Sequence, residues 1–106
     1  MDRIDKLKTF LQENPRDPFL RHALALEYVK LEQEAAARQL FEEILTDDPG
    51  YVGSYYHLGK LLERIRELPL AITWYQKGIE VARAAGDRHA LGELRGALEE
   101  AEGELE

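Results

Sequence analysis

The chain has 106 residues, of which 33% are charged, and a formal net charge of -7 at pH 7. This length builds one small domain, and the negative charge argues against a nucleic-acid backbone or an anionic membrane as partner. The absence of cysteine excludes disulfides, thiolate metal sites and cysteine nucleophiles. No apolar run approaches the roughly 18 residues of a membrane span, and no apolar signal segment follows Met1. We therefore expect a cytoplasmic protein.

Apolar residues recur at helical spacing in six segments of the chain, and no segment alternates with a period of two. Alanine, leucine and glutamate dominate the composition and favour helix. The sequence therefore predicts an all-α protein. In chain order, the expected helices cover about residues 2–14, 18–31, 34–47, 52–65, 69–85 and 88–104.

Residues that break or cap helices separate these segments. Pro15 ends the first helix, and Asp17 is expected to cap the second. The run at residues 48–50, Asp-Pro-Gly, is a strong breaker after the third helix. Gly86 fits the C-terminal cap of the fifth helix, and Asp87 fits the N-terminal cap of the sixth.

Shifting the sequence by 34 residues places apolar, small and proline residues on residues of the same kind. A period of this size is typical of stacked helical repeats, in which each helix pair packs only against its neighbours. The matched pairs are Pro15 with Pro49, Leu24 with Leu58, Ala25 with Gly59, Leu31 with Ile65, Ala37 with Ala71, Phe41 with Tyr75, and Leu45 with Ile79.

The repeated residues resemble the tetratricopeptide repeat (TPR) family, whose pattern is an aromatic, Leu-Gly and Tyr on one helix, then Ala, an aromatic and Ala on the next, then Pro. The aromatic that opens this pattern is replaced by Arg21 in the first repeat. The second repeat carries Tyr55, Leu58, Gly59, Leu62, Ala71, Tyr75 and Gly78, and the first carries Leu24, Ala25, Tyr28, Ala37, Phe41, Ile44 and Pro49.

The resemblance implies a short TPR-like α-solenoid of antiparallel helix hairpins in one domain, 1–106. Small residues let the helices of a hairpin approach closely, and each hairpin leaves an apolar face for the next to cover. Its expected units are an N-terminal half-repeat helix at 1–14, repeats at 16–49 and 50–86, and a C-terminal capping helix at 87–106.

The turn inside each repeat departs from the family pattern. The family usually has glycine there, whereas this chain has Glu32 and Arg66. The stretch 31–38 holds strong helix formers and no breaker. Two outcomes are open: packing forces the turn, or the second and third helices fuse into one rod, so that two chains form a domain-swapped homodimer.

The resemblance also implies a concave surface built from the first helix of each hairpin. Such a surface predicts a non-catalytic module that presents a groove to a protein or to a peptide, including one with an acidic end. The alternative is a self-assembling structural or engineered scaffold. The family's carboxylate-clamp positions hold His22 and Leu26, so that chaperone-tail function is not expected. The expected binding residues are Phe19, His22, Leu26, Val29, Tyr56, Lys60 and Arg64.

No set of residues in the sequence points to catalysis, a cofactor or a metal. His22, His57 and His89 lack the spacing of a metal motif, and Ser54 has no triad-like neighbours. The carboxylate pairs fit helix and turn surfaces. We therefore expect no enzyme activity. On the last helix, Gly92 and Gly96 are four residues apart, which predicts close packing against the fifth helix.

Overall fold

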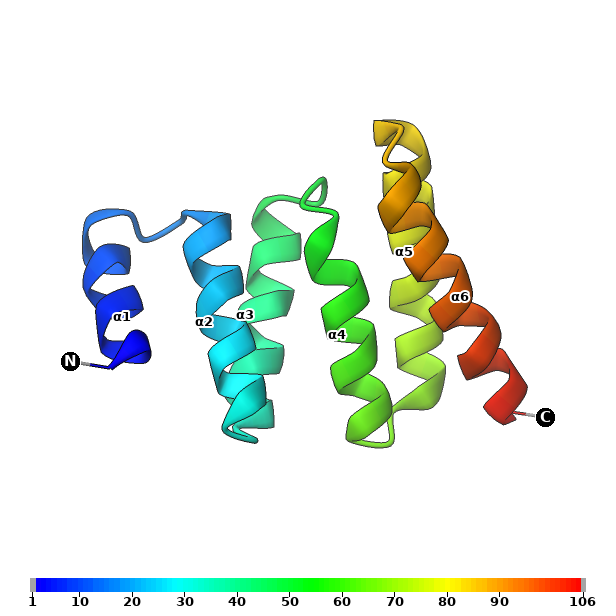
Figure 1. Ribbon diagram of the computed structural model, residues 1–106, viewed down its shortest axis with the longest axis horizontal. Helices are drawn as coiled ribbons and strands as arrows, with labels where there is room; N and C mark the ends of the chain where they lie inside the picture. The colour runs from blue at the N-terminus through cyan, green and yellow to red at the C-terminus, as the bar shows by residue number, and fades with distance from the viewer. Residues whose placement is uncertain (1, 106) are drawn as a thin grey trace.

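The computed structural model describes residues 2–105, and within them it contains six α-helices and no strand (Figure 1). The predicted all-α fold is confirmed. Met1 and Glu106, the outer ends of the predicted units 1–14 and 87–106, lie outside the described residues. The helices are α1 (Arg3–Glu13), α2 (Pro18–Lys30), α3 (Glu34–Asp47), α4 (Gly53–Arg64), α5 (Leu68–Ala85) and α6 (Arg88–Leu105).

The helices form a row of antiparallel neighbours (Figure 1). Helices α2 and α3 form one hairpin and α4 and α5 form the next, while α1 packs on α2, and α6 packs on both α5 and α4. The molecule measures 45 × 29 × 20 Å. This is the short solenoid that the repeat pattern predicts, because each hairpin contacts only the elements next to it in the chain.

The helices begin and end where the local sequence favours a cap. Asp2, Asp17 and Asp87 each accept a hydrogen bond from the backbone N–H three residues further on, at 2.8, 3.2 and 3.0 Å. Gly86 ends α5 in the left-handed region, with φ of 69°. The caps predicted at Asp17, Gly86 and Asp87 are therefore confirmed, since a carboxylate and a glycine satisfy these ends.

The turns inside both repeats form, so α2 and α3 are separate helices in this structure. Glu32 and Arg66 both adopt the left-handed region, with φ of 59° and 65°. At the first turn Glu32 N–H donates to the Val29 carbonyl at 3.0 Å, and Gln33 N–H donates to the Tyr28 carbonyl at 2.9 Å. These bonds satisfy the end of α2, but the left-handed backbone costs about 1–2 kcal/mol for a residue with a side chain.

The core is made of bulky residues seated against small ones. Phe41 and Tyr75 are fully buried, and the ring of Tyr75 lies directly against Gly59. The Tyr75 hydroxyl donates to Glu63, and burial together with this carboxylate raises the pKa of Tyr75. A second cluster around Leu7 seats α1 on α2. Helix α1 therefore covers the apolar face of the first hairpin.

The glycines divide into two groups with opposite roles. A Cβ added at Gly78 would lie 2.6 Å from the Cβ of Tyr55, so α4 and α5 approach too closely there for a side chain. A Cβ at Gly92 or Gly96 meets nothing within 4 Å. The predicted packing of these two glycines against α5 is therefore wrong, because α6 turns them towards solvent.

Alanine substitution should therefore have opposite effects at Gly78 and Gly96. We expect Gly78→Ala to lower the free energy of unfolding by about 1–2 kcal/mol, because overpacking outweighs the gain in helix propensity. We expect Gly96→Ala to raise it by about 0.5–1 kcal/mol, because the gain in propensity is unopposed. Urea unfolding followed by circular dichroism measures both, and equal effects of the same sign would contradict this packing.

Candidate functional site

A groove of about 320 Å³ lies along α2 and is closed on one side by Arg3, the first residue of α1. Its floor is apolar, and Phe19 at its edge is 67% exposed, the largest value among the exposed large hydrophobic residues. Three of the predicted binding residues, Phe19, His22 and Leu26, line it together. The full lining is Arg3, Phe19, His22, Ala23, Leu26, Glu27 and Lys30.

The charged end of this groove presents its cations outermost. Glu27 pairs with Arg3 at 3.4 Å and with Lys30 at 3.1 Å. The side chains of Arg3 and Lys30 are 63% and 71% exposed, whereas that of Glu27 is 16% exposed. Two cations share one carboxylate, so this end carries local positive charge on a chain of net charge -7.

The other predicted binding residues lie along α4 and at the end of α2. Lys60 Nζ lies 5.7 Å from the ring centroid of Tyr56, within range of a cation–π contact. Arg64 pairs with Glu34 at 3.0 Å and donates to the carbonyl of Val29 at 3.4 Å. The Val29 side chain is half-buried. The seven predicted residues thus form two groups, one lining the groove and one beside it.

Two histidines from neighbouring hairpins meet between α2 and α4. The ring centroids of His22 and His57 are 5.3 Å apart. His22 Nδ1 shares a hydrogen bond of 2.8 Å with the hydroxyl of Ser54, which is fully buried. Within residues 2–105 no group of three or more potential ligands could hold a metal ion. His22 therefore satisfies the buried hydroxyl of Ser54.

Acidification should destabilise the fold through this histidine pair. Burial, and then the neighbouring charge of His57, lowers the pKa of His22 to about 4, and burial also lowers the pKa of His57. The unfolded chain binds the proton first, so stability is full above pH of about 6.5 and declines as the pH falls towards 4.

As the pH is lowered from 6.5 to 5, we expect protonation of His22 in the unfolded chain to lower the free energy of unfolding by up to about 1.4 kcal/mol per pH unit. Denaturant unfolding at several pH values measures this slope. His22→Gln should flatten the slope, whereas His89→Gln, at an exposed position, should keep it. The same slope in both variants would contradict the assignment to His22.

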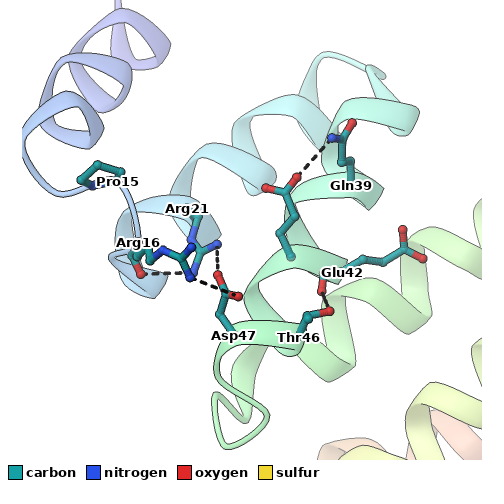
Figure 2. Close-up of a pocket in the computed structure, with 8 residues that line it drawn as sticks. Pro15, Arg16, Arg21, Gln39, Glu42, Thr46 and Asp47 are labelled. Carbon is teal, nitrogen blue, oxygen red and sulfur yellow. Dashed lines mark hydrogen bonds and ion pairs between the residues drawn. The ribbon is translucent and has the colours of Figure 1, made fainter.

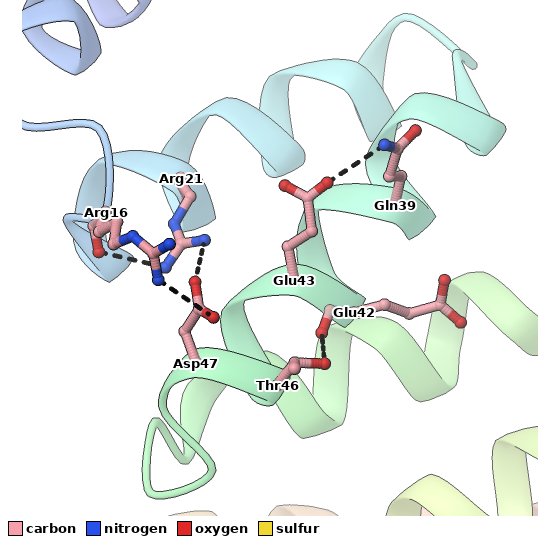
Figure 3. Close-up of polar contacts among 7 residues, drawn as sticks. All are labelled: Arg16, Arg21, Gln39, Glu42, Glu43, Thr46 and Asp47. Carbon is pink, nitrogen blue, oxygen red and sulfur yellow. Dashed lines mark hydrogen bonds and ion pairs between the residues drawn. The ribbon is translucent and has the colours of Figure 1, made fainter.

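A second groove, of about 520 Å³, lies between the α1–α2 connection and α3 (Figure 2). At its centre Arg21 donates to Asp47 at 3.0 Å, and Arg16 pairs with the same carboxylate at 3.6 Å. Glu42 and Glu43 stand on the far side (Figure 3). As in the first groove, two cations share one carboxylate, but here Glu42 and Glu43 add two more carboxylates, so this groove has no excess of positive charge.

Arg21 explains how the first repeat replaces the missing aromatic residue. Its side chain is buried, and it donates to the carbonyl of Arg16 at 3.1 Å. At the matching position of the second repeat, the Tyr55 hydroxyl donates to the carbonyl of Pro49 at 2.5 Å. Both residues therefore tie the start of a helix to the loop before it.

No helix within residues 2–105 is long and apolar enough to cross a membrane. Neither a family model nor a curated protein sequence matches the chain.

Solved structures do match. A tetratricopeptide repeat domain protein from Salinibacter ruber is 52% identical, with a TM-score of 0.79 over 82% of this chain and 97% of that chain. A protein from Bordetella parapertussis is 26% identical, with a TM-score of 0.84 over 98% and 90% of the two chains. The TPR2B domain of yeast Sti1, solved in complex with pHsp70, is 14% identical, with a TM-score of 0.88 over 95% and 81%. The chain belongs to the tetratricopeptide repeat family.

Proposed function

We propose that this protein is a non-catalytic interaction module whose concave face binds a peptide or protein. The observation that carries the proposal is the groove along α2, where the exposed ring of Phe19 stands beside His22 and Leu26. A solvent-exposed phenylalanine in a concave apolar groove is suited to anchoring a partner's side chain.

The charge of the groove favours a partner with an apolar side chain next to an acidic group. Arg3 and Lys30 stand outside Glu27 at one end, so a carboxylate of the partner would meet cations first. The yeast Sti1 domain, which shares this fold, was solved with pHsp70. This supports peptide or protein binding by the fold, and the partner here is identified only by its chemistry. The cytoplasmic location stays a prediction.

Selection from a displayed peptide library tests the proposal. The tightest peptide should then be titrated by calorimetry against the parent chain and two variants. We expect Phe19→Ser to weaken binding at least tenfold, and Phe10→Ser to leave it unchanged, because Phe10 is also exposed but does not line the groove. Equal affinities for both variants, or no selected peptide, would contradict the proposal.

One observation favours the alternative of a domain-swapped homodimer. Glu32 holds a left-handed backbone between strong helix formers, so a continuous helix would relieve this strain. Two chains could then complete each other's hairpins.

Glu32→Gly tests this alternative through stability and mass. We expect the variant to raise the free energy of unfolding by about 0.5–1 kcal/mol, because glycine adopts this backbone without a steric penalty, although it gains freedom in the unfolded chain. A slowly dissociating dimer in the parent chain that disappears in Glu32→Gly would support swapping. A dimer of unchanged abundance would exclude it.

A further inference from the structure

We propose that α1 is a displaceable cover, and that the apolar face of α2 beneath it binds a short amphipathic helix of a partner protein. Helix α1 stands at one end of the row and α6 at the other, and they are attached differently (Figure 1). Helix α6 packs on both α5 and α4, whereas α2 is the only helix within residues 2–105 with which α1 shares an extensive contact. Helix α1 has 11 residues and α6 has 18. Because a solenoid is held together by contacts between neighbours, α1 is the weaker of the two ends.

The apolar cluster that seats α1 is separate from the main core. Leu7 is the one buried side chain of α1, and Ile4 and Leu11 are partly buried beside it. Helix α6, by contrast, contributes three buried residues to the main core itself. A segment with few buried apolar side chains opens at a lower free energy than the core does. Helix α1 can therefore undock while α2–α6 stay folded.

Undocking of α1 uncovers an apolar stripe on α2. The residues of this stripe are spaced by three, one and four positions, which places them on one face of the helix. Leu40 of α3 borders the stripe. A stripe of this kind is what an amphipathic helix packs against. Its residues are Leu20, Ala23, Leu24 and Tyr28.

Two openings beside α1 already reach this stripe. On one side, Leu24, Tyr28 and Leu40 line a pocket of about 220 Å³ to which α1 contributes no residue. On the other side, Ala23 lines the groove along α2, where Arg3 is the one residue of α1. Helix α1 thus covers the stripe incompletely, and an incoming helix meets apolar surface before α1 leaves.

The contacts that α1 makes in this seat define the chemistry of the partner. Its apolar residues Ile4, Leu7 and Leu11 are spaced by three and four positions, which is the pattern of a helix that anchors in a groove. Directly before them, Arg3 pairs with Glu27 at 3.4 Å. Because the side chain of Arg3 is 63% exposed, this ion pair holds α1 only weakly. The partner is therefore a short helix with leucine or isoleucine at the same spacing and a basic residue just before the first of them.

A fluorescently labelled peptide with the sequence of residues 2–16 is the probe for this site. Leu7→Asp in the full-length chain releases the chain's own α1, because a buried carboxylate without a partner is costly. We expect Leu7→Asp to bind the peptide at least about tenfold more tightly than the parent chain, whose own α1 competes at a high effective concentration. Phe10→Asp, at an exposed position of the same helix, should bind it as weakly as the parent chain does. Fluorescence anisotropy measures all three affinities.

Hydrogen exchange of the parent chain tests the weak attachment of α1 independently. The amide hydrogens of α1 should exchange about 100-fold faster than those of α6, the other end helix. Leu7→Ala, a milder change, should bind the peptide with an affinity between those of Leu7→Asp and the parent chain, and it keeps the test decisive if Leu7→Asp fails to fold.

Equal protection of α1 and α6 from exchange, or no binding of the peptide to either Leu7 variant, would overturn the proposal. A dimer of the parent chain that Leu7→Asp abolishes would also overturn it, because the stripe would then hold α1 of a second copy. Phe19→Ser added to Leu7→Asp should leave the affinity for this peptide unchanged, since Phe19 lines the groove along α2 and is not part of the stripe. The proposed function and this second site can therefore fail separately.

Discussion

Replacing Phe41 by alanine is expected to lower the free energy of unfolding by about 3–5 kcal/mol, a large effect for a single substitution. The ring is fully buried in the main core and lies in edge contact with His22, at a centroid distance of 5.6 Å. Its removal leaves a cavity between the first hairpin and α4 that rigid helices cannot close. Folded domains of about 100 residues are stable by roughly 5–15 kcal/mol, so the loss is a large part of the total.

Phe10→Ala is the matched control, because Phe10 is 53% exposed on α1. We expect it to change the free energy of unfolding by less than about 0.5 kcal/mol. Urea unfolding followed by circular dichroism measures both variants. Similar effects for the two phenylalanines would mean that Phe41 does not fill the gap between the hairpins.

Replacing Asp47 by alanine is expected to lower the free energy of unfolding by about 3 kcal/mol. The side chain of Arg21 is buried, its Nε has no hydrogen-bond partner within the described residues, and Asp47 supplies its counter-charge. Without Asp47 the guanidinium remains buried and uncompensated, which costs about 3–5 kcal/mol in a fully buried pair. Because Asp47 is partly exposed, we expect a loss of unfolding free energy at the lower end of this range.

Two controls test whether the loss of unfolding free energy comes from the broken charge pair or from removing any carboxylate that lines this groove. Glu43→Ala removes a carboxylate that lines the same groove and accepts a hydrogen bond from the exposed Gln39, and it should cost less than about 0.5 kcal/mol. Arg21→Met together with Asp47→Ala should recover most of the loss, because an apolar side chain needs no counter-charge. A double variant as unstable as Asp47→Ala alone would contradict the role given to the charge pair.

The sequence was sufficient for the parts of the fold that depend on local signals. Asp17 and Gly86 lie at helix ends because a carboxylate and a left-handed glycine satisfy backbone groups within a few residues. Phe41 and Tyr75 occupy equivalent positions of the 34-residue repeat, and both are buried in the core as this equivalence predicts. The repeat indicates core residues because repeated packing requires repeated residue types.

Contacts between distant residues were not predictable in the same way. Arg21 contacts Asp47, which lies 26 positions later in the sequence, and His22 contacts Ser54, which lies 32 positions later. No periodic signal in the sequence links these residue types. Gly96 was misjudged because spacing on a helix does not show which face is covered. The binding residues stay a prediction, since the surface of a repeat protein varies independently of its core.

A nuclear magnetic resonance titration with the tightest selected peptide would show whether the concave face is the binding surface. If it is, the largest changes in amide signals occur at Phe19, His22 and Leu26, while Gln39 on α3 and Lys77 on α5 stay unaffected. Changes confined to the groove around Arg16 and Gln39 would contradict binding at the concave face.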